Sequence, residues 1–162
     1  MVTQRDAHDL DLSALWALAS KQFALGLETL HGPDHWQRVE RNGLQLAAAT
    51  TGADVLVVRL FAVVHDSQRQ NENHDPEHGQ RAANWARELR GQHFKLDDAR
   101  FNVLCYACIW HDKGHVSDDP TIGVCWDADR LDLPRVGVKP SEALMSTPLG
   151  KNLARMGIAA LS

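Results

Sequence analysis

Residues 54–66 read D-V-L-V-V-R-L-F-A-V-V-H-D, an almost unbroken apolar run that closes on a histidine and an aspartate. The density of Val, Leu and Phe over this length predicts a helix that is largely buried. Because the residues just before its end are apolar, the side chains of His65 and Asp66 are expected to emerge together at the edge of the core.

Outside this run, apolar residues recur every three or four positions in almost every segment, and two-residue alternation is nearly absent. The pattern predicts an all-α protein. Pro33 and Pro120 suit the first turns of helices, where amide donors are free in any case, and Asp75-Pro76-Glu77 is typical of another helix start. The predicted helices span about 12–27, 33–52, 54–66, 75–91, 97–112 and 120–133.

The 162 residues are enough for one compact domain with a full core, and we expect a single helical bundle over 1–162. Its core should lie within about 31–133, and 134–162 should wrap around it as loops with one or two short helices. Hydrophobic residues make up 44% and charged residues 23%, which excludes a disordered or fibrous chain. A net charge of -4 without a long basic run argues against binding to duplex nucleic acid.

Nothing near Met1 resembles a basic segment followed by an apolar stretch, and no segment reaches the roughly 18 apolar residues that a membrane span needs. We therefore expect a cytoplasmic protein without a membrane partner. The three cysteines form an odd set, and Cys105 and Cys108 share a face of a predicted helix, so buried free thiols are expected rather than disulfides. A redox or zinc C-x-x-C is the alternative, but it lacks a partner pair.

The adjacent His65 and Asp66 offer an imidazole and a carboxylate, a combination that suits a divalent first-row metal. The alternative is an ordinary histidine that interacts with the dipole at the end of the helix. Asp129 falls on the apolar face of its predicted helix, and a buried carboxylate needs a metal, an arginine or several amides as partners. Periodicity alone does not exclude Asp127. His35 provides a further imidazole from a different helix.

Three segments in order, H-G-P-D-H-W-x-R-V from residue 31, H-D at 65 and D-A-D-R-L-D from residue 127, resemble the HD superfamily of metal-dependent phosphohydrolases. The resemblance covers roughly 31–133. It implies a helical bundle of the HD-domain type with one H…HD…D ligand set, namely His35, His65, Asp66 and Asp129. Some branches hold two metals through two more histidines, and His78 and His111 match those positions. The alternative is that both histidines donate hydrogen bonds to phosphate.

The resemblance further implies one or two divalent ions per chain, of Mn, Mg, Co, Ni, Zn or Fe. The expected reaction is hydrolysis of a phosphomonoester or phosphodiester, in a nucleotide or another small phosphorylated substrate, by water that the metal activates. Arg69 is the first candidate for neutralising the phosphoryl oxygens and Lys113 is the second, while Arg130 also lies beside a ligand segment. Glu72 is expected to protonate the leaving oxygen or to orient the water. Asp66 belongs to the predicted catalytic set through the ion.

Two other functions remain open. Some HD relatives use a di-iron site for oxidative cleavage, and the same donors would accommodate iron. A non-catalytic nucleotide-binding module is the third possibility. Among the remaining histidines, His31, His74 and His115 are expected at the rim of the cleft, and His8 and His93 at the surface. No glycine-rich phosphate loop identifies the substrate.

Overall fold

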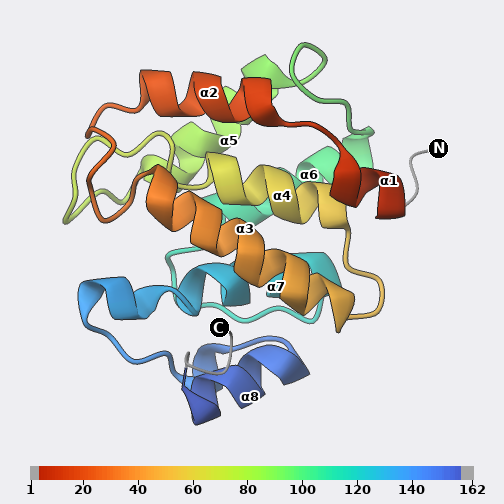
Figure 1. Ribbon diagram of the computed structural model, residues 1–162, viewed down its shortest axis with the longest axis vertical. Coiled ribbons are helices and arrows are strands. Elements are labelled where there is room, and N and C mark those ends of the chain that lie inside the picture. The colour runs from red at the N-terminus through yellow and green to blue at the C-terminus, as the bar shows by residue number, and fades with distance from the viewer. Residues whose placement is uncertain (1–3, 158–162) are drawn as a thin grey trace.

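The computed structural model describes residues 4–157, and all the regular elements within this range are helical (Figure 1). This confirms the predicted all-α fold. The eight α-helices are α1 Gln4–Asp9, α2 Ser13–Gln22, α3 Pro33–Ala48, α4 Val55–Val64, α5 His78–Leu89, α6 Asp98–Trp110, α7 Pro120–Arg130 and α8 Pro148–Met156. Two 3₁₀ turns, η1 Leu133–Val136 and η2 Glu142–Leu144, lie between α7 and α8.

Helix α4 is the central element of the bundle, because every residue in it except Val55 and Arg59 is buried. It contacts α1, α2, α3, α5, α6 and α7. Asp54 caps its first turn by accepting a hydrogen bond from the Val57 amide, and Arg100 of α6 pairs with the same carboxylate. Helix α2 lies across α4 on the side away from α8 (Figure 1). The apolar run at 54–66 therefore forms the buried centre that the sequence predicted.

The predicted proline starts are confirmed, since Pro33 and Pro120 are the first residues of α3 and α7. Asp119 caps α7 by accepting hydrogen bonds from the amides of Thr121 and Ile122, both at 2.9 Å. Two predicted helix ends are too late. Helix α2 stops at Gln22 and α3 at Ala48, and each is followed by a turn with a glycine at positive φ, Gly26 or Gly52. Both glycines favour the left-handed conformation that ends the helical run.

The predicted start of α5 at Asp75 is wrong, because the helix begins at His78. The Asp75 carboxylate accepts hydrogen bonds from the amides of Gln70 and Asn71 and pairs with Arg81 of α5. It therefore closes the polar loop before α5 instead of capping the helix. This loop covers the residues that the sequence predicted to be a polar connection, Gln68 to Asp75.

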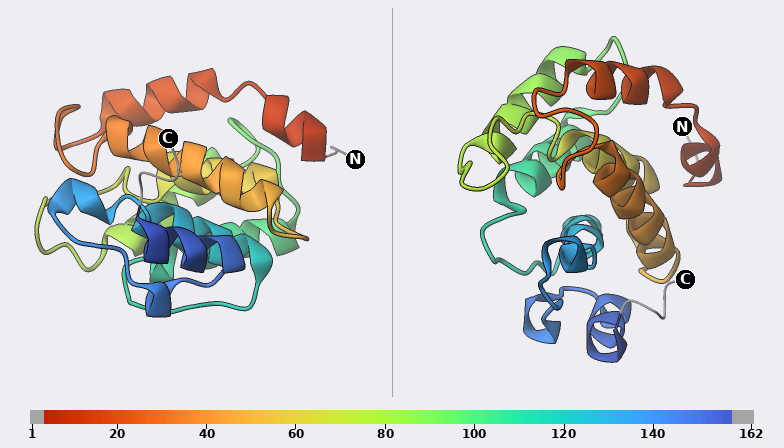
Figure 2. Two further views of the ribbon diagram at one scale, coloured as in Figure 1. Left: turned by 60° about the horizontal axis from the view of Figure 1, so that its bottom comes forward. Right: turned by 60° about the vertical axis from the view of Figure 1, so that its left-hand side comes forward.

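The segment after α7 folds back along it and ends in α8, so that α7 and α8 lie side by side (Figure 2). Asp127 of α7 anchors this return. Its carboxylate accepts hydrogen bonds from the amides of Ser146 and Thr147, both at 2.8 Å, and from the Thr147 hydroxyl at 2.7 Å. The prediction of short helices in the C-terminal wrap is confirmed, although its last residues, 158–162, lie outside the described part of the chain.

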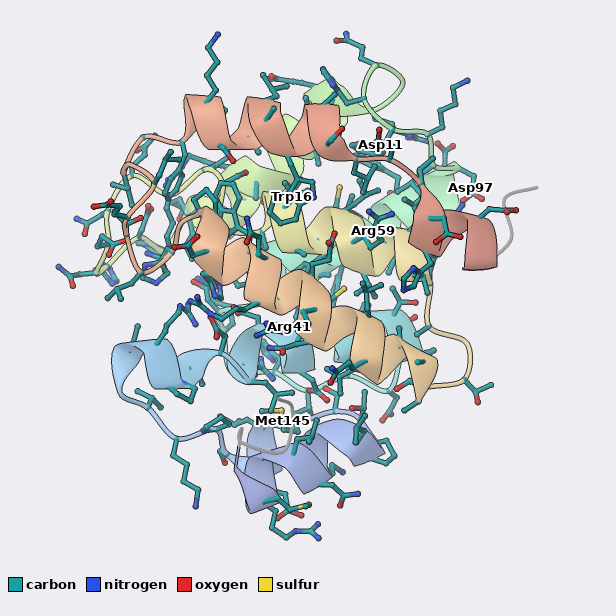
Figure 3. The ribbon with its side chains drawn as sticks, viewed as in Figure 1. Asp11, Trp16, Arg41, Arg59, Asp97 and Met145 are labelled. Atoms are coloured by element: carbon teal, nitrogen blue, oxygen red, sulfur yellow. The ribbon has the colours of Figure 1, made fainter. Side chains whose placement is uncertain are left out.

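Arg59 is the one charged residue of α4, and it ties the N-terminal helix to the bundle (Figure 3). Its Nη1 donates to the carbonyl oxygens of Ala7 and Leu10, at 2.9 and 2.7 Å. The thiols of Cys105, Cys108 and Cys125 are free and buried, as expected. No helix within 4–157 is long and apolar enough to cross a membrane.

Helices α5 and α6 approach closely because α5 presents small residues to α6, namely Gly79, Ala82, Ala83 and Ala86. A Cβ at Gly79 would overlap the carbonyl oxygens of Cys108 and Ile109 in α6. Gly79 directly follows His78, so this close helix contact lies beside one of the predicted ligands. The spacing of the two helices therefore depends on the absence of a side chain at this position.

Replacing Gly79 with Ala should lower the free energy of unfolding by about 1–3 kcal/mol, the usual cost of forcing extra volume into a packed contact. Urea unfolding followed by circular dichroism measures the change. Gln80→Ala, at the exposed neighbouring position, is the control and should leave the stability within about 0.5 kcal/mol. Equal stability of Gly79→Ala and the unchanged protein would contradict the close helix contact.

Candidate metal centre

Six predicted ligand residues converge at one end of the bundle, although they come from five helices. His35 lies in the first turns of α3, and Asp129 lies in the last turn of α7. The others sit at helix ends: His65 and Asp66 directly after α4, His78 at the start of α5, and His111 directly after α6. All are buried except Asp129, whose side chain is 14% exposed.

The first group is the predicted H…HD…D set. The Nε2 atoms of His35 and His65 lie 3.1 Å apart. Asp129 Oδ1 lies 3.1 Å from the first of these nitrogens and 3.4 Å from the second. Asp66 Oδ2 is 3.4 Å from His35 Nε2. The structure thus brings all four residues together around one point.

The second group shares Asp66 with the first. Asp66 Oδ1 lies 3.3 Å from His78 Nε2 and 3.3 Å from His111 Nε2, and these two nitrogens are 3.0 Å apart. The two oxygens of one carboxylate therefore face two different histidine pairs. This arrangement offers one metal position on each side of Asp66.

The outer nitrogen of each imidazole is held by an acceptor. The Nδ1 atom of His35 donates to Asp132 Oδ2 at 2.7 Å, and Arg38 donates to the same carboxylate. Backbone carbonyl oxygens accept from the other three rings: Phe61 from His65 at 3.0 Å, Asp75 from His78 at 2.5 Å, and Cys108 from His111 at 2.6 Å. Because a carbonyl oxygen only accepts, these Nδ1 atoms carry a hydrogen. Each Nε2 then faces the cluster as a lone pair when its ring is neutral and as a second donor when the ring is protonated.

These lone pairs make the cluster suitable for a metal ion. Two neutral rings held in this way cannot form a hydrogen bond between His35 Nε2 and His65 Nε2, and the same holds for His78 and His111. A cation at about 2.0–2.2 Å from each nitrogen would satisfy both members of a pair, and carboxylates complete a donor set that divalent metals prefer. The residues therefore fit one or two divalent ions, and they are consistent with a site of the HD type.

The charges in the cluster also favour a cation. Burial raises the pKa of Asp66, but the neighbouring His65 and the hydrogen bonds from His111, His35 and His78 hold it well below its usual value. The pKa of Asp129 is likewise held low by His35 and His65 despite burial. Burial lowers the pKa of His35, yet its surrounding carboxylates, Asp129 foremost, raise it to about 10, so that without a metal this ring is protonated at Nε2 and a bound ion would take the place of that proton. The carboxylates of Asp66 and Asp129 are anionic at neutral pH.

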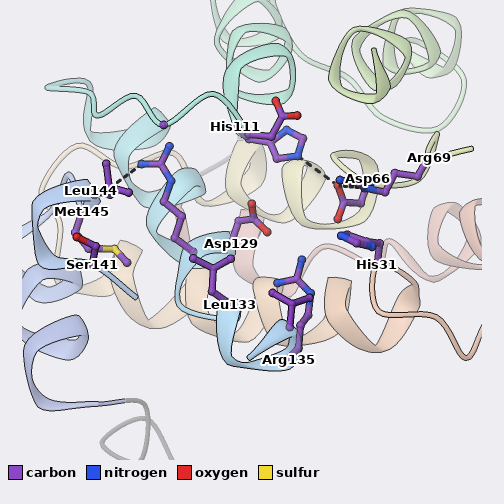
Figure 4. Close-up of a pocket in the computed structure, with 14 residues that line it drawn as sticks. His31, Asp66, Arg69, His111, Asp129, Leu133, Arg135, Ser141, Leu144 and Met145 are labelled. Atoms are coloured by element: carbon purple, nitrogen blue, oxygen red, sulfur yellow. Dashed lines mark hydrogen bonds and ion pairs between the residues drawn. The ribbon is translucent and has the colours of Figure 1, made fainter. Parts of the chain in front are cut away.

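A cavity of about 270 Å³ opens beside the cluster (Figure 4). Asp66, His111 and Asp129 form part of its wall, so that a molecule in the cavity would contact the metal positions. The rest of the wall contains three arginines, one further carboxylate and several apolar side chains, including Arg69, Arg130, Arg135, Asp112, Leu133, Leu144 and Met145.

The three other predicted catalytic residues are placed differently from one another. Arg69 lines the cavity, and its Nε lies 3.6 Å from Asp66 Oδ1. Glu72 stays outside the wall and accepts a hydrogen bond from His31 Nδ1 at 3.1 Å. Lys113 also stays outside, where its Nζ donates to the Pro76 carbonyl oxygen at 3.1 Å.

Sequence reasoning missed Asp132, which orients His35 and is the last residue of the D-A-D-R-L-D segment. Its place three residues after Asp129 was the available signal. His31, expected at the rim, lies in the cavity wall, while His74 and His115 are exposed and are not part of it. His8 and His93 are exposed as predicted. Asp127 is engaged by Ser146 and Thr147 and does not reach the cluster.

No match to this chain is found among family models, curated proteins or solved structures. The interpretation of the site therefore rests on the residues of the cluster and their geometry.

Asp66→Ala should abolish binding of divalent metal, because it removes the carboxylate that both groups share. The metal content of purified protein and titration with Mn²⁺ measure the loss, and circular dichroism should find most of the helical fold retained. Asp118→Ala, which removes an exposed acid away from the cluster, should bind metal like the unchanged protein. Undiminished metal content in Asp66→Ala would refute the assignment.

His111→Ala should reduce the bound Mn²⁺ from two ions per chain to one, because it dismantles only the second group. His78→Ala should do the same, whereas His35→Ala should remove the ion of the first group and leave the other. Elemental analysis after equilibrium dialysis gives the stoichiometry. Two ions retained in both His111→Ala and His78→Ala would exclude a metal position between these rings.

Proposed function

We propose that the chain is a metal-dependent phosphohydrolase of the HD type that acts on a small phosphate ester. One observation carries the proposal: the four residues of the H…HD…D pattern converge beside a cavity into which an arginine projects. A buried metal cluster without a cavity would support a structural ion only. A cavity that has three arginines in its wall, beside carboxylates that a metal would neutralise, supports an anionic substrate.

A divalent ion, when bound, supplies Lewis acidity and lowers the pKa of a coordinated water. Four imidazoles with their Nδ1 atoms already engaged hold the Nε2 donors in place before any ion binds. Asp132 fixes the ring of His35 through a 2.7 Å hydrogen bond, which is the kind of outer contact that sets ligand orientation. The chain therefore preorganises the donors with little freedom of the rings.

Arg69 is suited to hold the phosphoryl group. Its Nη1 donates to the Asn71 carbonyl oxygen at 2.8 Å, which fixes the guanidinium at the mouth of the cluster. Its Nε is buried and has no hydrogen-bond acceptor. A phosphoryl oxygen beside Asp66 would supply that acceptor, and the guanidinium would stabilise the charge that accumulates on this oxygen in the transition state.

His31 lies in the cavity wall and is paired with Glu72, which lies outside it. Burial of Glu72 raises its pKa, but the hydrogen bonds from His31 and from the Leu30 amide outweigh this effect and lower it. Glu72 is thus a carboxylate that accepts from His31 Nδ1, and burial lowers the pKa of His31, so that Nε2 of the neutral ring accepts a hydrogen bond from a hydroxyl of the substrate or from water. We assign Glu72 as a positioning residue that acts through His31.

Arg69→Ala should lower kcat/KM by about a hundredfold, the usual effect of removing one donor to a developing anion, while metal content stays unchanged. The assay is phosphate release from a panel of phosphomonoesters and phosphodiesters, including nucleotides, with Mn²⁺, Mg²⁺, Co²⁺, Ni²⁺, Zn²⁺ or Fe²⁺. Arg41→Ala on the exposed face of α3 is the matched control and should retain full activity (Figure 3).

In oxygen-18 water, the label should enter the released phosphoryl group, because the bond that breaks is the one between phosphorus and the leaving oxygen. No phosphoryl-enzyme should be trapped by acid quenching, because Ser141, the serine of the cavity wall, has no hydrogen bond to a base that could activate it. Absence of phosphate release with every metal, together with bound iron whose absorbance changes under oxygen, would favour a di-iron oxygenase instead. Full turnover by Arg69→Ala would remove the arginine from the mechanism and make Lys113 the next candidate.

A further inference from the structure

Within residues 4–157, the buried side-chain nitrogen and oxygen atoms without a hydrogen-bond partner are Arg69 Nε and Arg130 Nη2. Both arginines line the same cavity. The proposed function uses Arg69 but assigns nothing to Arg130. Because unpartnered buried donors are rare in folded proteins, two of them in one wall suggest that a ligand provides the missing acceptors.

Arg130 is a buried cation without an ion-pair partner. It is 6% exposed, its Nη1 donates to the Leu144 carbonyl oxygen at 2.6 Å, and its guanidinium lies over the Trp126 ring. The nearest carboxylates are engaged elsewhere: Asp127 with Ser146 and Thr147, and Asp129 with His35 and His65. A guanidinium stays protonated in proteins, so a full positive charge is buried here without a direct ion pair, although Asp129 and Asp127 attract it from a longer distance.

Other arginines of the bundle differ from Arg130 in this respect. Arg38, Arg81 and Arg100 each pair with a carboxylate at 2.5–2.8 Å, although all three are more exposed. The more deeply buried Arg130 has only a carbonyl oxygen and an aromatic face. Burial of an unpaired charge is costly, and a carboxylate or phosphate oxygen at Nη2 would remove much of that cost.

The cavity has two ends on either side of Asp129 (Figure 4). Arg69, Asp66 and His31 lie at one end, and Ser141, Leu144 and Met145 lie at the other. The hydrogen bond to the Leu144 carbonyl oxygen places Arg130 at this second end. Leu144 belongs to the three-residue turn η2 and is 40% exposed, so this end of the cavity is formed in part by a short surface segment.

We propose that the end of the cavity formed by Arg130, Ser141 and Leu144 binds a second anionic group of the substrate. The substrate class is then a phosphate ester whose leaving group carries a carboxylate or another phosphate. This inference rests on the proposed function, because it takes the metal end as the place of the phosphoryl group under attack. The positive charge of Arg130, which has no direct ion pair among the described residues, favours an anion there over a neutral carbonyl.

Non-hydrolysable phosphonates test the assignment by binding alone. Isothermal titration of the Mn²⁺-saturated protein should find that 3-phosphonopropionate binds about tenfold more tightly than propylphosphonate, as expected for one added charge-assisted hydrogen bond. Phosphonoacetate and 4-phosphonobutyrate vary the reach between the two ends. Propane-1,3-diphosphonate tests a second phosphate in place of the carboxylate, and 3-phosphonopropionamide tests a neutral acceptor.

The carboxylate of 3-phosphonopropionate could bind the metal instead of Arg130. Variants at Arg130 and Ser141 distinguish these two positions. Arg130→Met should reduce the preference for 3-phosphonopropionate to less than about twofold without changing propylphosphonate binding. Ser141→Asp, at an exposed position, should reduce the preference by charge repulsion, whereas Ser141→Asn should preserve it. Together the two positions keep the test independent of whether Arg130→Met folds.

Three results would overturn the inference. An equal preference in the unchanged protein, Arg130→Met and Ser141→Asp would place the carboxylate elsewhere. Binding of the amide as tightly as the carboxylate would make the second group a neutral acceptor. Binding of both phosphonates without preference would overturn the second subsite alone, whereas binding of neither would overturn the phosphoryl site and the proposed function with it.

Discussion

The Asp66 carboxylate is the constraint on which this end of the bundle depends. At 2% exposure, an anion needs compensation from several directions, and Asp66 receives it from histidines of α3, α5 and α6 at 3.3–3.4 Å and from Arg69. The helix ends must therefore meet at this point to bury the charge. Because α4 presents Asp66 directly after its own buried length, the same element provides both the hydrophobic centre and the centre of the polar cluster.

The sequence predicted the features that depend on local chemistry. The apolar density of α4, the prolines at the starts of α3 and α7, and the order of the motif residues each follow from residue type and spacing. Helix boundaries that depend on residues far away in the chain could not be predicted from the sequence. Helix α5 starts three residues late because Asp75 binds the amides of its own loop and Arg81. Helix α1 was missed because a short polar segment gains its anchor from Arg59, some fifty positions along the chain.

The hydrogen bonds that orient the histidines of the site could not be predicted from the sequence either. The pairing of His31 with Glu72 and that of His35 with Asp132 join residues 41 and 97 positions apart. A one-dimensional pattern identifies which side chains are able to bind metal, but not which acceptor fixes each ring. That second property decides whether an imidazole presents a lone pair or a proton to the cluster. The ligand set was therefore predictable from the motif, and its preorganisation only from the three-dimensional structure.

The charges of the metal cluster affect how the neighbouring cavity binds a substrate. Asp66 and Asp129 are anionic and lie in the wall of the cavity, so without a cation they would repel a phosphate ester. The arginines of the wall do not neutralise the two carboxylates equally. Arg69 lies against Asp66, whereas Arg130 lies toward the other end of the cavity. A divalent ion between the histidines would reverse the local sign where a phosphoryl group binds. Metal binding should therefore precede substrate binding, and the buried arginines would then act on the substrate instead of compensating the cluster.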